Sequence, residues 1–158
     1  MHGSSDDPVD MKSRFIDGGA DHCQTRRMSD HKQLVMTAMT ELIGNGNLDA
    51  VDPLMRDDFV DHNPGVATSS KADWLAVFKS FPLQQMRIDI RRVMADDEYV
   101  TMFSRRWLPD GKVIAVADLF RVADGLIAEH WEVVQPISDG PVHPLEMLDA
   151  GAGFTSAR

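Results

Sequence analysis

Hydrophobic positions divide the chain into segments with helical spacing followed by segments with strand spacing. Apolar residues over 34–43 repeat at intervals of three and four, which is typical of an amphipathic helix. Asp30 and Gln33 stand at capping-box spacing just before this stripe. The pattern therefore predicts a first helix that starts near Asp30 and ends at the Gly44-Asn45-Gly46 break.

The next segments predict two shorter helices with a strand between them. A second helix is expected within Leu48–Arg56, and a short strand follows over Phe59–Asn63. Ser70, with Asp73 three residues later, predicts a cap for a third helix. This helix should end near Phe81-Pro82, since the residue before proline disfavours the helical conformation.

Four further segments carry strand patterns. Apolar and polar residues alternate over 86–91, and apolar runs follow over 99–108, 113–122 and 126–134. Asp124-Gly125 supplies the positive φ of a tight reversal, which predicts an antiparallel hairpin. The element order predicts an α+β domain in which three N-terminal helices pack on one curved, mainly antiparallel sheet, forming an open cone.

These patterns also predict how the chain is divided. Residues 1–28 lack a core-forming pattern, so we expect a flexible N-terminal arm, and Met28 is an alternative start residue. Residues 29–140 form a single domain, which agrees with the usual size of domains. Residues 141–158 are rich in Gly and Pro and are expected to form a C-terminal tail.

Composition and charge restrict the classes of partner. The formal net charge of −9 argues against nucleic acid and anionic membranes, because phosphate binding requires clustered Lys and Arg. The single cysteine, Cys23, excludes an intrachain disulfide and fits a cytoplasmic protein. No apolar run reaches the roughly 18 residues that a membrane span needs.

The predicted hairpin carries candidate chemistry. Both of its apolar runs have apolar residues on both faces, as expected of central strands, yet they contain Asp118, His130 and Glu132. A buried ionisable group costs several kcal/mol unless it is paired or neutralised. Three such groups in one hairpin therefore indicate a polar pocket.

Two stretches resemble a known family. The runs DLFRV at 118–122 and EHWEV at 129–133, followed by Gln135, resemble the last hairpin of SnoaL-like polyketide cyclases. The run FVDHNP at 59–64 resembles the strand that ends in a His-Asn-Pro turn in the same family. The resemblance covers roughly residues 30–137. It implies the cone-shaped NTF2-like (cystatin-like) fold shared by nuclear transport factor 2, ketosteroid isomerase and limonene epoxide hydrolase.

The resemblance also implies roles for individual residues. Asp118 falls where ketosteroid isomerase has its acidic oxyanion-hole residue and where the cyclases have their proposed acid/base. His130 could hold Asp118 or bond a substrate carbonyl, so Asp118 and His130 are the candidate catalytic residues. Asn63 falls where ketosteroid isomerase has its proton-shuttling Asp, a role that Asn cannot perform; it would instead bond a carbonyl or a water. The candidate substrate-binding residues are His62, Asn63, Trp74, Phe120, Glu132 and Val134.

Structural interpretations of the same residues stay open. A buried Asp–His pair can be a structural network, and Arg105, Arg106 or Arg121 could neutralise Asp118 or Glu132. The histidines His62, His130 and His143 lack a compact ligand spacing, so we expect no metal site, and no fingerprint of another cofactor is present.

The leading hypothesis is a cofactor-independent enzyme that cyclises or isomerises a small apolar carbonyl compound by acid–base chemistry. One carboxyl group of raised pKa in a dry pocket, here Asp118, can both remove and return a proton. The alternatives are a non-catalytic protein that binds a small hydrophobic ligand, and an enzyme that activates water as limonene epoxide hydrolase does. That hydrolase relies on an Asp-Arg-Asp constellation, for which the sequence assigns no arginine in the cavity. We further expect a homodimer through the sheet, because the helices can cover only one of its two apolar faces.

Overall fold

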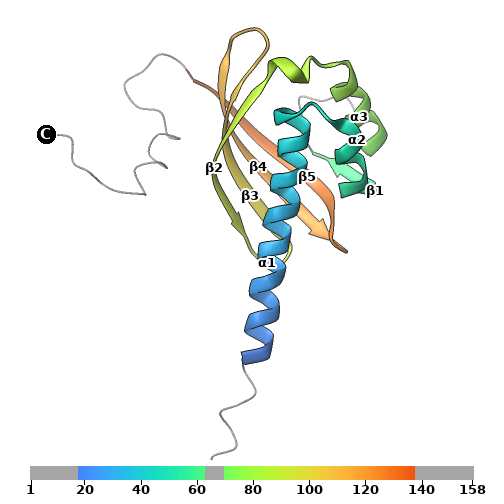
Figure 1. Ribbon diagram of the computed structural model, residues 1–158, viewed down its shortest axis with the longest axis vertical. Coiled ribbons are helices and arrows are strands. Elements are labelled where there is room, and N and C mark those ends of the chain that lie inside the picture. The colour runs from blue at the N-terminus through green and yellow to red at the C-terminus, as the bar shows by residue number, and fades with distance from the viewer. Residues whose placement is uncertain (1–17, 63–69, 138–158) are drawn as a thin grey trace, which may run out of the picture.

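The computed structural model describes residues 18–62 and 70–137. A long helix opens this part of the chain, two short helices and an edge strand follow, and four long strands close it (Figure 1). The helical elements are α1 (Gly18–Met39) with the π-turn η1 (Thr40–Gly44), α2 (Leu48–Val51) with the 3-10 turn η2 (Asp52–Leu54), α3 (Lys71–Ser80), and the 3-10 turn η3 (Leu83–Gln85). The strands are β1 (Met55–Asp61), β2 (Arg87–Ala95), β3 (Tyr99–Trp107), β4 (Val113–Ala123) and β5 (Leu126–Pro136).

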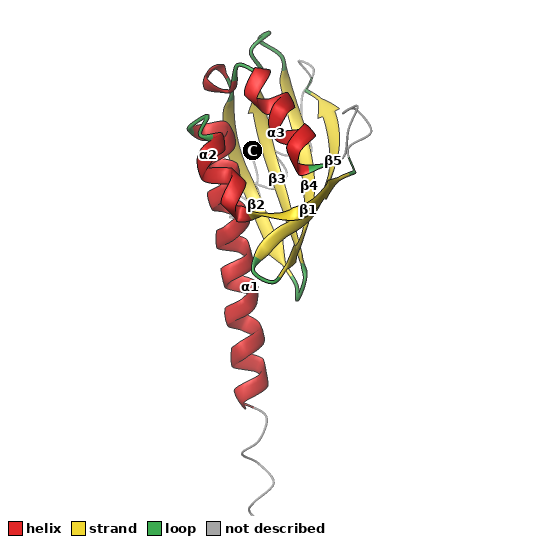
Figure 2. Cartoon of the chain, turned by 90° about the vertical axis from the view of Figure 1, so that its right-hand side faces the viewer, coloured by secondary structure: helices red, strands yellow, loops and turns green. Residues whose placement is uncertain are grey.

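The five strands form one mixed sheet in the order β1-β5-β4-β3-β2. Strand β1 runs parallel to β5, and every other neighbouring pair is antiparallel. The helices α2 and α3 lie over one face of this curved sheet (Figure 2). The predicted α+β architecture, with helices on one side of a mainly antiparallel sheet, is therefore confirmed.

The reversal between β4 and β5 has the predicted conformation. Asp124 and Gly125 both have positive φ, at 54° and 75°, so two residues connect the strands. This conformation matches the right-handed twist of the strands on either side. Beyond the turn the register of β4 and β5 shifts once, between Arg121 and Val122, and the shifted register determines which side chains meet below the helices.

The start of the first helix is the main departure from the sequence prediction. The helix α1 begins at Gly18 rather than near Asp30, so the expectation of a loosely structured arm is wrong for residues 18–28. Residues 22–27 are exposed, and this end of α1 extends beyond the sheet (Figure 1). These residues contain no proline, and a helix propagates readily from a packed segment once nucleation has occurred. Residues 1–17 and the predicted tail 141–158 lie outside the described part.

The caps of the two shorter helices follow local sequence signals. The Ser70 side chain accepts a hydrogen bond from the Asp73 amide at 3.2 Å, as predicted for the third helix. The Asn47 side chain accepts one from the Ala50 amide at 3.3 Å, and Pro53 lies in the first turn of η2. Strand β1 begins earlier than predicted, at Met55, since Met55 and Phe59 are both buried and pack in the core.

The core lies between the helices and the inner face of the sheet. Its fully buried members come from every layer: Val35, Leu42, Ile43, Val51, Met55, Phe59, Val100, Met102, Phe120, Val122 and Ile127. No helix in the described ranges is long and apolar enough to span a membrane. The inner face is apolar towards the β4–β5 turn and becomes ionic further along the strands, which is where the candidate site lies.

Candidate functional site

Strand register brings the predicted polar residues of the hairpin together on the inner face. Asp118 pairs with Glu132 across β4 and β5, and Phe120 pairs with His130. Because paired residues point to the same side and side chains alternate along a strand, these four residues share one face. The register shift between Arg121 and Val122 produces this pairing, and the sequence did not predict it. The parallel neighbour β1 adds Asp61, which is in register with His130. The antiparallel neighbour β3 adds Arg106, which is 7% exposed.

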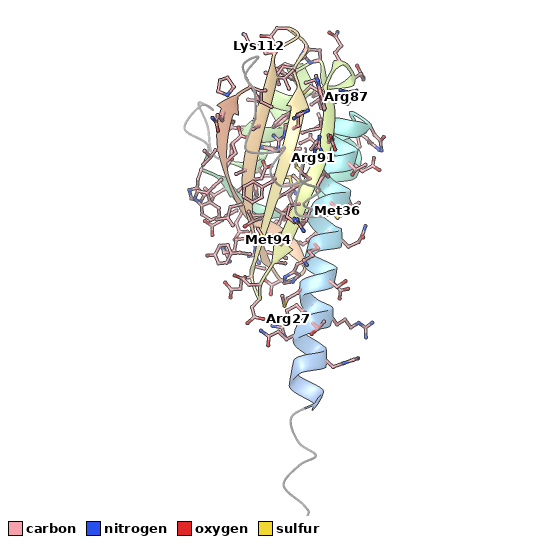
Figure 3. The ribbon with its side chains drawn as sticks, turned by 90° about the vertical axis from the view of Figure 1, so that its left-hand side faces the viewer. Arg27, Met36, Arg87, Arg91, Met94 and Lys112 are labelled. Carbon is pink, nitrogen blue, oxygen red and sulfur yellow. The ribbon has the colours of Figure 1, made fainter. Side chains whose placement is uncertain are left out.

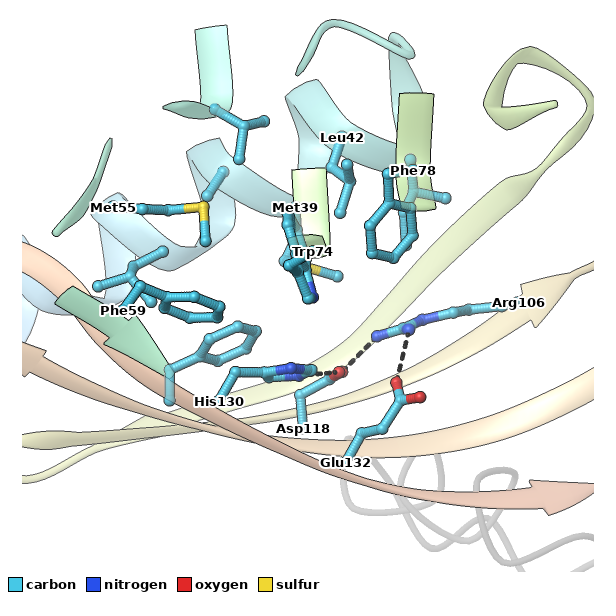
Figure 4. Close-up of a pocket in the computed structure, with 15 residues that line it drawn as sticks. Met39, Leu42, Met55, Phe59, Trp74, Phe78, Arg106, Asp118, His130 and Glu132 are labelled. Carbon is cyan, nitrogen blue, oxygen red and sulfur yellow. Dashed lines mark hydrogen bonds and ion pairs between the residues drawn. The ribbon is translucent and has the colours of Figure 1, made fainter. Parts of the chain in front are cut away.

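These side chains form a continuous series of ionic contacts, which we call the ionic chain: Asp61, His130, Asp118, Arg106 and Glu132. Nδ1 of His130 lies 2.9 Å from Oδ1 of Asp61, and Nε2 lies 3.1 Å from Oδ1 of Asp118. Nη2 of Arg106 donates to Oδ2 of Asp118 at 2.5 Å. Nη1 of Arg106 lies 3.4 Å from Oε2 of Glu132, a much weaker contact (Figure 4).

His130 is a cation in this arrangement. A carboxylate oxygen lies against each of its two ring nitrogens, and a carboxylate can only accept, so both nitrogens carry a proton. Burial disfavours the charged ring, but the hydrogen bonds and charges of Asp118 and Asp61 outweigh it and raise the pKa of His130 to about 9. The ring also stacks on Phe120, with ring centroids 4.7 Å apart.

The two carboxyl groups that contact Arg106 differ in proton affinity. Burial alone would raise the pKa of Asp118, but the charge of Arg106 and the hydrogen bond and charge of His130 lower it overall. Burial raises the pKa of Glu132; Asp118 and Asp61 add to this rise, which Arg106 and His130 only partly offset. The hypothesis that Asp118 is the carboxyl group of raised pKa is therefore not supported. Glu132 has that property, because burial and the neighbouring carboxylates outweigh the charges of Arg106 and His130.

An apolar cavity lies directly above the ionic chain (Figure 4). Its volume is about 30 Å³, enough for one or two water molecules. Arg106, Asp118, His130 and Glu132 form its floor. Its walls are apolar and come from α1, the short helices, β1 and the sheet: Ala38, Met39, Leu42, Ile43, Val51, Met55, Phe59, Trp74, Phe78, Phe120 and Ile127.

The structure separates the predicted substrate-binding residues into two groups. Trp74, Phe120 and Glu132 line the cavity. His62 lies on the opposite face of the sheet, where it bonds Glu129 at 2.7 Å and stacks on Trp131 with centroids 4.4 Å apart. Val134 is 45% exposed and is not part of the cavity wall. Asn63 lies outside the described residues.

Two members of the ionic chain, Arg106 and Asp61, were not assigned a place in the site from the sequence. Arg106 was one of three arginines that could neutralise the acids, and only the register of β3 against β4 distinguishes it from Arg105. Asp61 appeared in the resemblance without a role, although an acid inside a short apolar strand could have signalled a buried partner. Both residues act across strands, and Asp61 lies 69 residues from His130, so no local spacing reveals these contacts.

The same acids could in principle bind a metal ion. Asp118, His130 and Glu132 can each offer one ligand atom, and these atoms lie within 4.8 Å of one another. The guanidinium of Arg106 already contacts both carboxyl groups, and both nitrogens of His130 are engaged by carboxylates. A metal ion would have to displace these cations, so Arg106 and His130 supply the positive charge at this site.

Replacing Asp118 tests the ion-pair geometry. Asp118→Asn keeps the shape of the side chain but removes the anion shared by Arg106 and His130. We expect the free energy of unfolding to fall by roughly 3–5 kcal/mol, as when one partner of a buried ion pair is lost. Urea denaturation would measure the change, with Asp89→Asn as the control. Asp89 pairs with Arg91 at the surface, where such pairs contribute at most about 1 kcal/mol. Unchanged or higher stability of Asp118→Asn would mean that Asp118 is a neutral acid in an apolar site.

The charge of His130 predicts how stability depends on pH. The folded pKa of about 9 lies above the ordinary value of 6.5, so protonated His130 stabilises the fold fully below pH 6.5. This contribution is lost as the pH rises towards 9. Denaturation midpoints should therefore fall across this window, and more steeply in the native protein than in His130→Gln. The control is His22→Gln, at an exposed position of α1. Equal slopes for the native protein and His130→Gln would contradict a buried imidazolium.

Comparison with solved structures identifies the fold. A candidate ketosteroid isomerase from Kribbella flavida DSM 17836 is similar with a TM-score of 0.62 and 17% identity, over 73% of this chain and 85% of that chain. An LEH-like epoxide hydrolase from M. tuberculosis gives 0.58 and 20%, over 68% and 84%. IdmH, a candidate polyketide cyclase from Streptomyces antibioticus, gives 0.54 and 22%, over 65% and 90%. At these identities the similarity establishes the NTF2-like fold alone.

The family is established by the sequence itself. No curated protein matches the chain. The family model described as a SnoaL-like domain matches residues 36–130, which is more than half of the chain and spans the segment from α1 to His130. The predicted resemblance is confirmed: the chain belongs to the SnoaL-like domain family.

Proposed function

We propose that this protein is a cofactor-independent enzyme that moves a proton on a small, mainly apolar carbonyl compound, with Glu132 as the acid/base. The observation that carries the proposal is the shared guanidinium of Arg106. It joins a carboxylate of lowered pKa, Asp118, to a carboxyl group of raised pKa, Glu132, at the floor of an apolar cavity. Perturbed proton affinities in a cavity are characteristic of catalytic sites.

The raised pKa of Glu132 suits proton exchange. A general acid or base works best when its pKa lies near the working pH, and an exposed Glu titrates well below neutrality. The ionised form would take a proton from the carbon next to the carbonyl, and the protonated form would return it at the same or another atom. Glu132 thus takes the role that the resemblance implied for Asp118.

Arg106 would stabilise the charge that develops on the carbonyl oxygen. When the proton leaves carbon, the electron pair moves towards oxygen, and a fixed cation in a dry cavity stabilises that oxygen strongly. Asp118 and Ser104 hold the guanidinium in place, the latter through a 3.2 Å hydrogen bond from Nε. Isomerisation and aldol-type ring closure both require this combination of a proton carrier and an oxygen-stabilising group.

The size of the cavity sets a condition on this function. At about 30 Å³, the cavity holds a carbonyl compound only after wall side chains move. Met39 and Phe78 are suited to such movement, since Met is flexible and Phe78 is only partly buried. The proposal therefore includes opening of the wall between α1 and α3 when the substrate binds.

A water-activating reaction is the second candidate. Its support is the acid–Arg–acid arrangement of Asp118, Arg106 and Glu132, which supplies the arginine that the sequence did not assign. In this reaction Asp118 would accept a proton from water, and Glu132 would give one to the oxygen of an epoxide. The water-sized cavity fits such a nucleophile.

Isotope exchange tests the main proposal without knowledge of the natural substrate. Small cyclic ketones, from cyclopentanone to decalones, would be incubated with the protein in D2O, and exchange at the carbon next to the carbonyl followed by NMR. We expect Glu132→Gln to lower the exchange rate by about 10²- to 10⁴-fold. The control is Glu98→Gln, at an exposed position of the turn between β2 and β3, which should exchange at the native rate.

A parallel assay separates the two reactions. Cyclohexene oxide in ¹⁸O-labelled water would yield a labelled diol if the second candidate is correct, and Asp118→Asn and Glu132→Gln should then both abolish it. Ketone exchange no faster than that of Glu132→Gln would contradict the main proposal. Absence of both reactions would favour the non-catalytic ligand-binding alternative.

The outer face of the sheet supports an assembly proposal. No helix in the described part of the chain covers this face, which Figure 3 shows from the side opposite α2 and α3. Leu119, Trp131 and Val133 lie on it in adjacent strands, and Val133 is 71% exposed. An apolar sheet face of this kind is typically covered by a partner. We propose that a second copy of the chain covers it, which gives a homodimer.

Light scattering at micromolar concentration tests the homodimer. We expect twice the mass of the chain for the native protein and a shift towards the monomer for Val133→Lys, which places a charge in the proposed interface. Met36→Lys is the matched control, because Met36 is 38% exposed but lies on α1. A monomeric native protein would contradict the proposal.

A further inference from the structure

Asp61 is a buried acid that the proposed reaction does not use. It lies at the end of β1, is 3% exposed, and does not line the cavity. Its Oδ1 meets Nδ1 of His130 at 2.9 Å, whereas its Oδ2 is buried and has no hydrogen-bond partner among the described residues. Burying a carboxylate with half of its acceptors unused is costly, so stability alone does not account for this residue.

The backbone around Asp61 holds it firmly against His130. The two residues are direct partners in the parallel pairing of β1 and β5. The next amide, that of His62, donates to the His130 carbonyl at 2.8 Å. The carboxyl group of Asp61 is therefore held in contact with Nδ1 of His130, and the other ring nitrogen, Nε2, contacts Asp118.

We propose that Asp61 is a positioning residue that keeps His130 doubly protonated, and thereby keeps Asp118 an anion oriented on Arg106. This inference rests on the proposed function, because an anionic Asp118 holds Arg106 in the position from which it contacts Glu132, the proposed acid/base. A carboxylate at Nδ1 favours a proton there and repels a lone pair. With that proton in place, the second proton at Nε2 gives the ring a full positive charge facing Asp118.

The other groups around His130 do not replace Asp61. Asp118 faces it from β4, Glu132 lies on its own strand, and Arg106 faces the same cavity from β3. The cavity residues contributed by the helices are apolar. Asp61 is thus the only described charge on the Nδ1 side. Without it, a neutral ring could still donate from Nε2 to Asp118, but the positive charge that lowers the pKa of Asp118 would be lost.

The inference can be tested in the protein without any substrate. Side-chain ¹⁵N NMR of His130 in the native protein should show both nitrogens protonated at neutral pH, with loss of a proton near pH 9. In Asp61→Asn this transition should move at least one pH unit lower, while Asp61→Glu should restore part of the shift. Asp58→Asn is the control, because Asp58 lies on the same strand but is exposed and pairs with Arg56. A neutral His130 in the native protein at pH 7, or an unchanged transition in Asp61→Asn, would overturn the inference.

The pH dependence of ketone exchange distinguishes a failure of this inference from a failure of the proposed function. If both hold, ketone exchange should decline as His130 loses its proton, near pH 9 in the native protein and at lower pH in Asp61→Asn. If the native protein exchanges no ketone but the NMR shift occurs, the proposed reaction fails and the role of Asp61 towards His130 stands. If exchange occurs with the same pH profile in both proteins, the positioning role fails and the proposed reaction stands.

Discussion

The contact between Arg106 and Asp118 is the interaction on which the rest of the site depends. Two unit charges 2.5 Å apart in a region of low dielectric attract strongly, but removing both from water costs about as much. The pair persists because His130 satisfies the second oxygen of Asp118 and Ser104 satisfies Nε of Arg106. These residues come from three neighbouring strands, β3, β4 and β5. The charge balance of the site therefore depends on the register of these strands.

The way in which Arg106 is shared between Asp118 and Glu132 also affects the pKa of Glu132. Asp118 takes the short bond of Arg106, and Glu132 lies 3.4 Å from the same guanidinium. Burial has the largest effect on the pKa of Glu132. One cation between two unequal acids thus leaves one carboxyl group with a lowered pKa and the other with a raised pKa. One fold can carry different chemistries, so the function is argued from the side chains on the inner face of β3, β4 and β5.

Much of this arrangement follows from the sequence, and the remainder depends on contacts between distant segments. The ionisable residues of the hairpin indicated a polar pocket, and Asp124-Gly125 indicated the turn. The register shift between Arg121 and Val122, which brings Asp118 opposite Glu132, has no signal in the sequence pattern. Neither argument could choose between Arg105 and Arg106, because both belong to one run and only pairing with β4 separates their faces. The proton affinities were assigned to the wrong acid for the same reason: the partner that lowers the pKa of Asp118 comes from another strand. The small cavity volume reflects side chains from helices and sheet together, which no single segment encodes.

Arg106 lies between an acid whose pKa is lowered, Asp118, and an acid whose pKa is raised, Glu132. Carbon-13 NMR of the side-chain carboxyl groups, followed through a pH titration, measures both ionisations in one sample. We expect the pKa of Asp118 to lie below the ordinary Asp value of 3.8 and that of Glu132 above the ordinary Glu value of 4.5. Titration of Glu132 at or below its ordinary value, or of Asp118 above that of Glu132, would contradict this expectation.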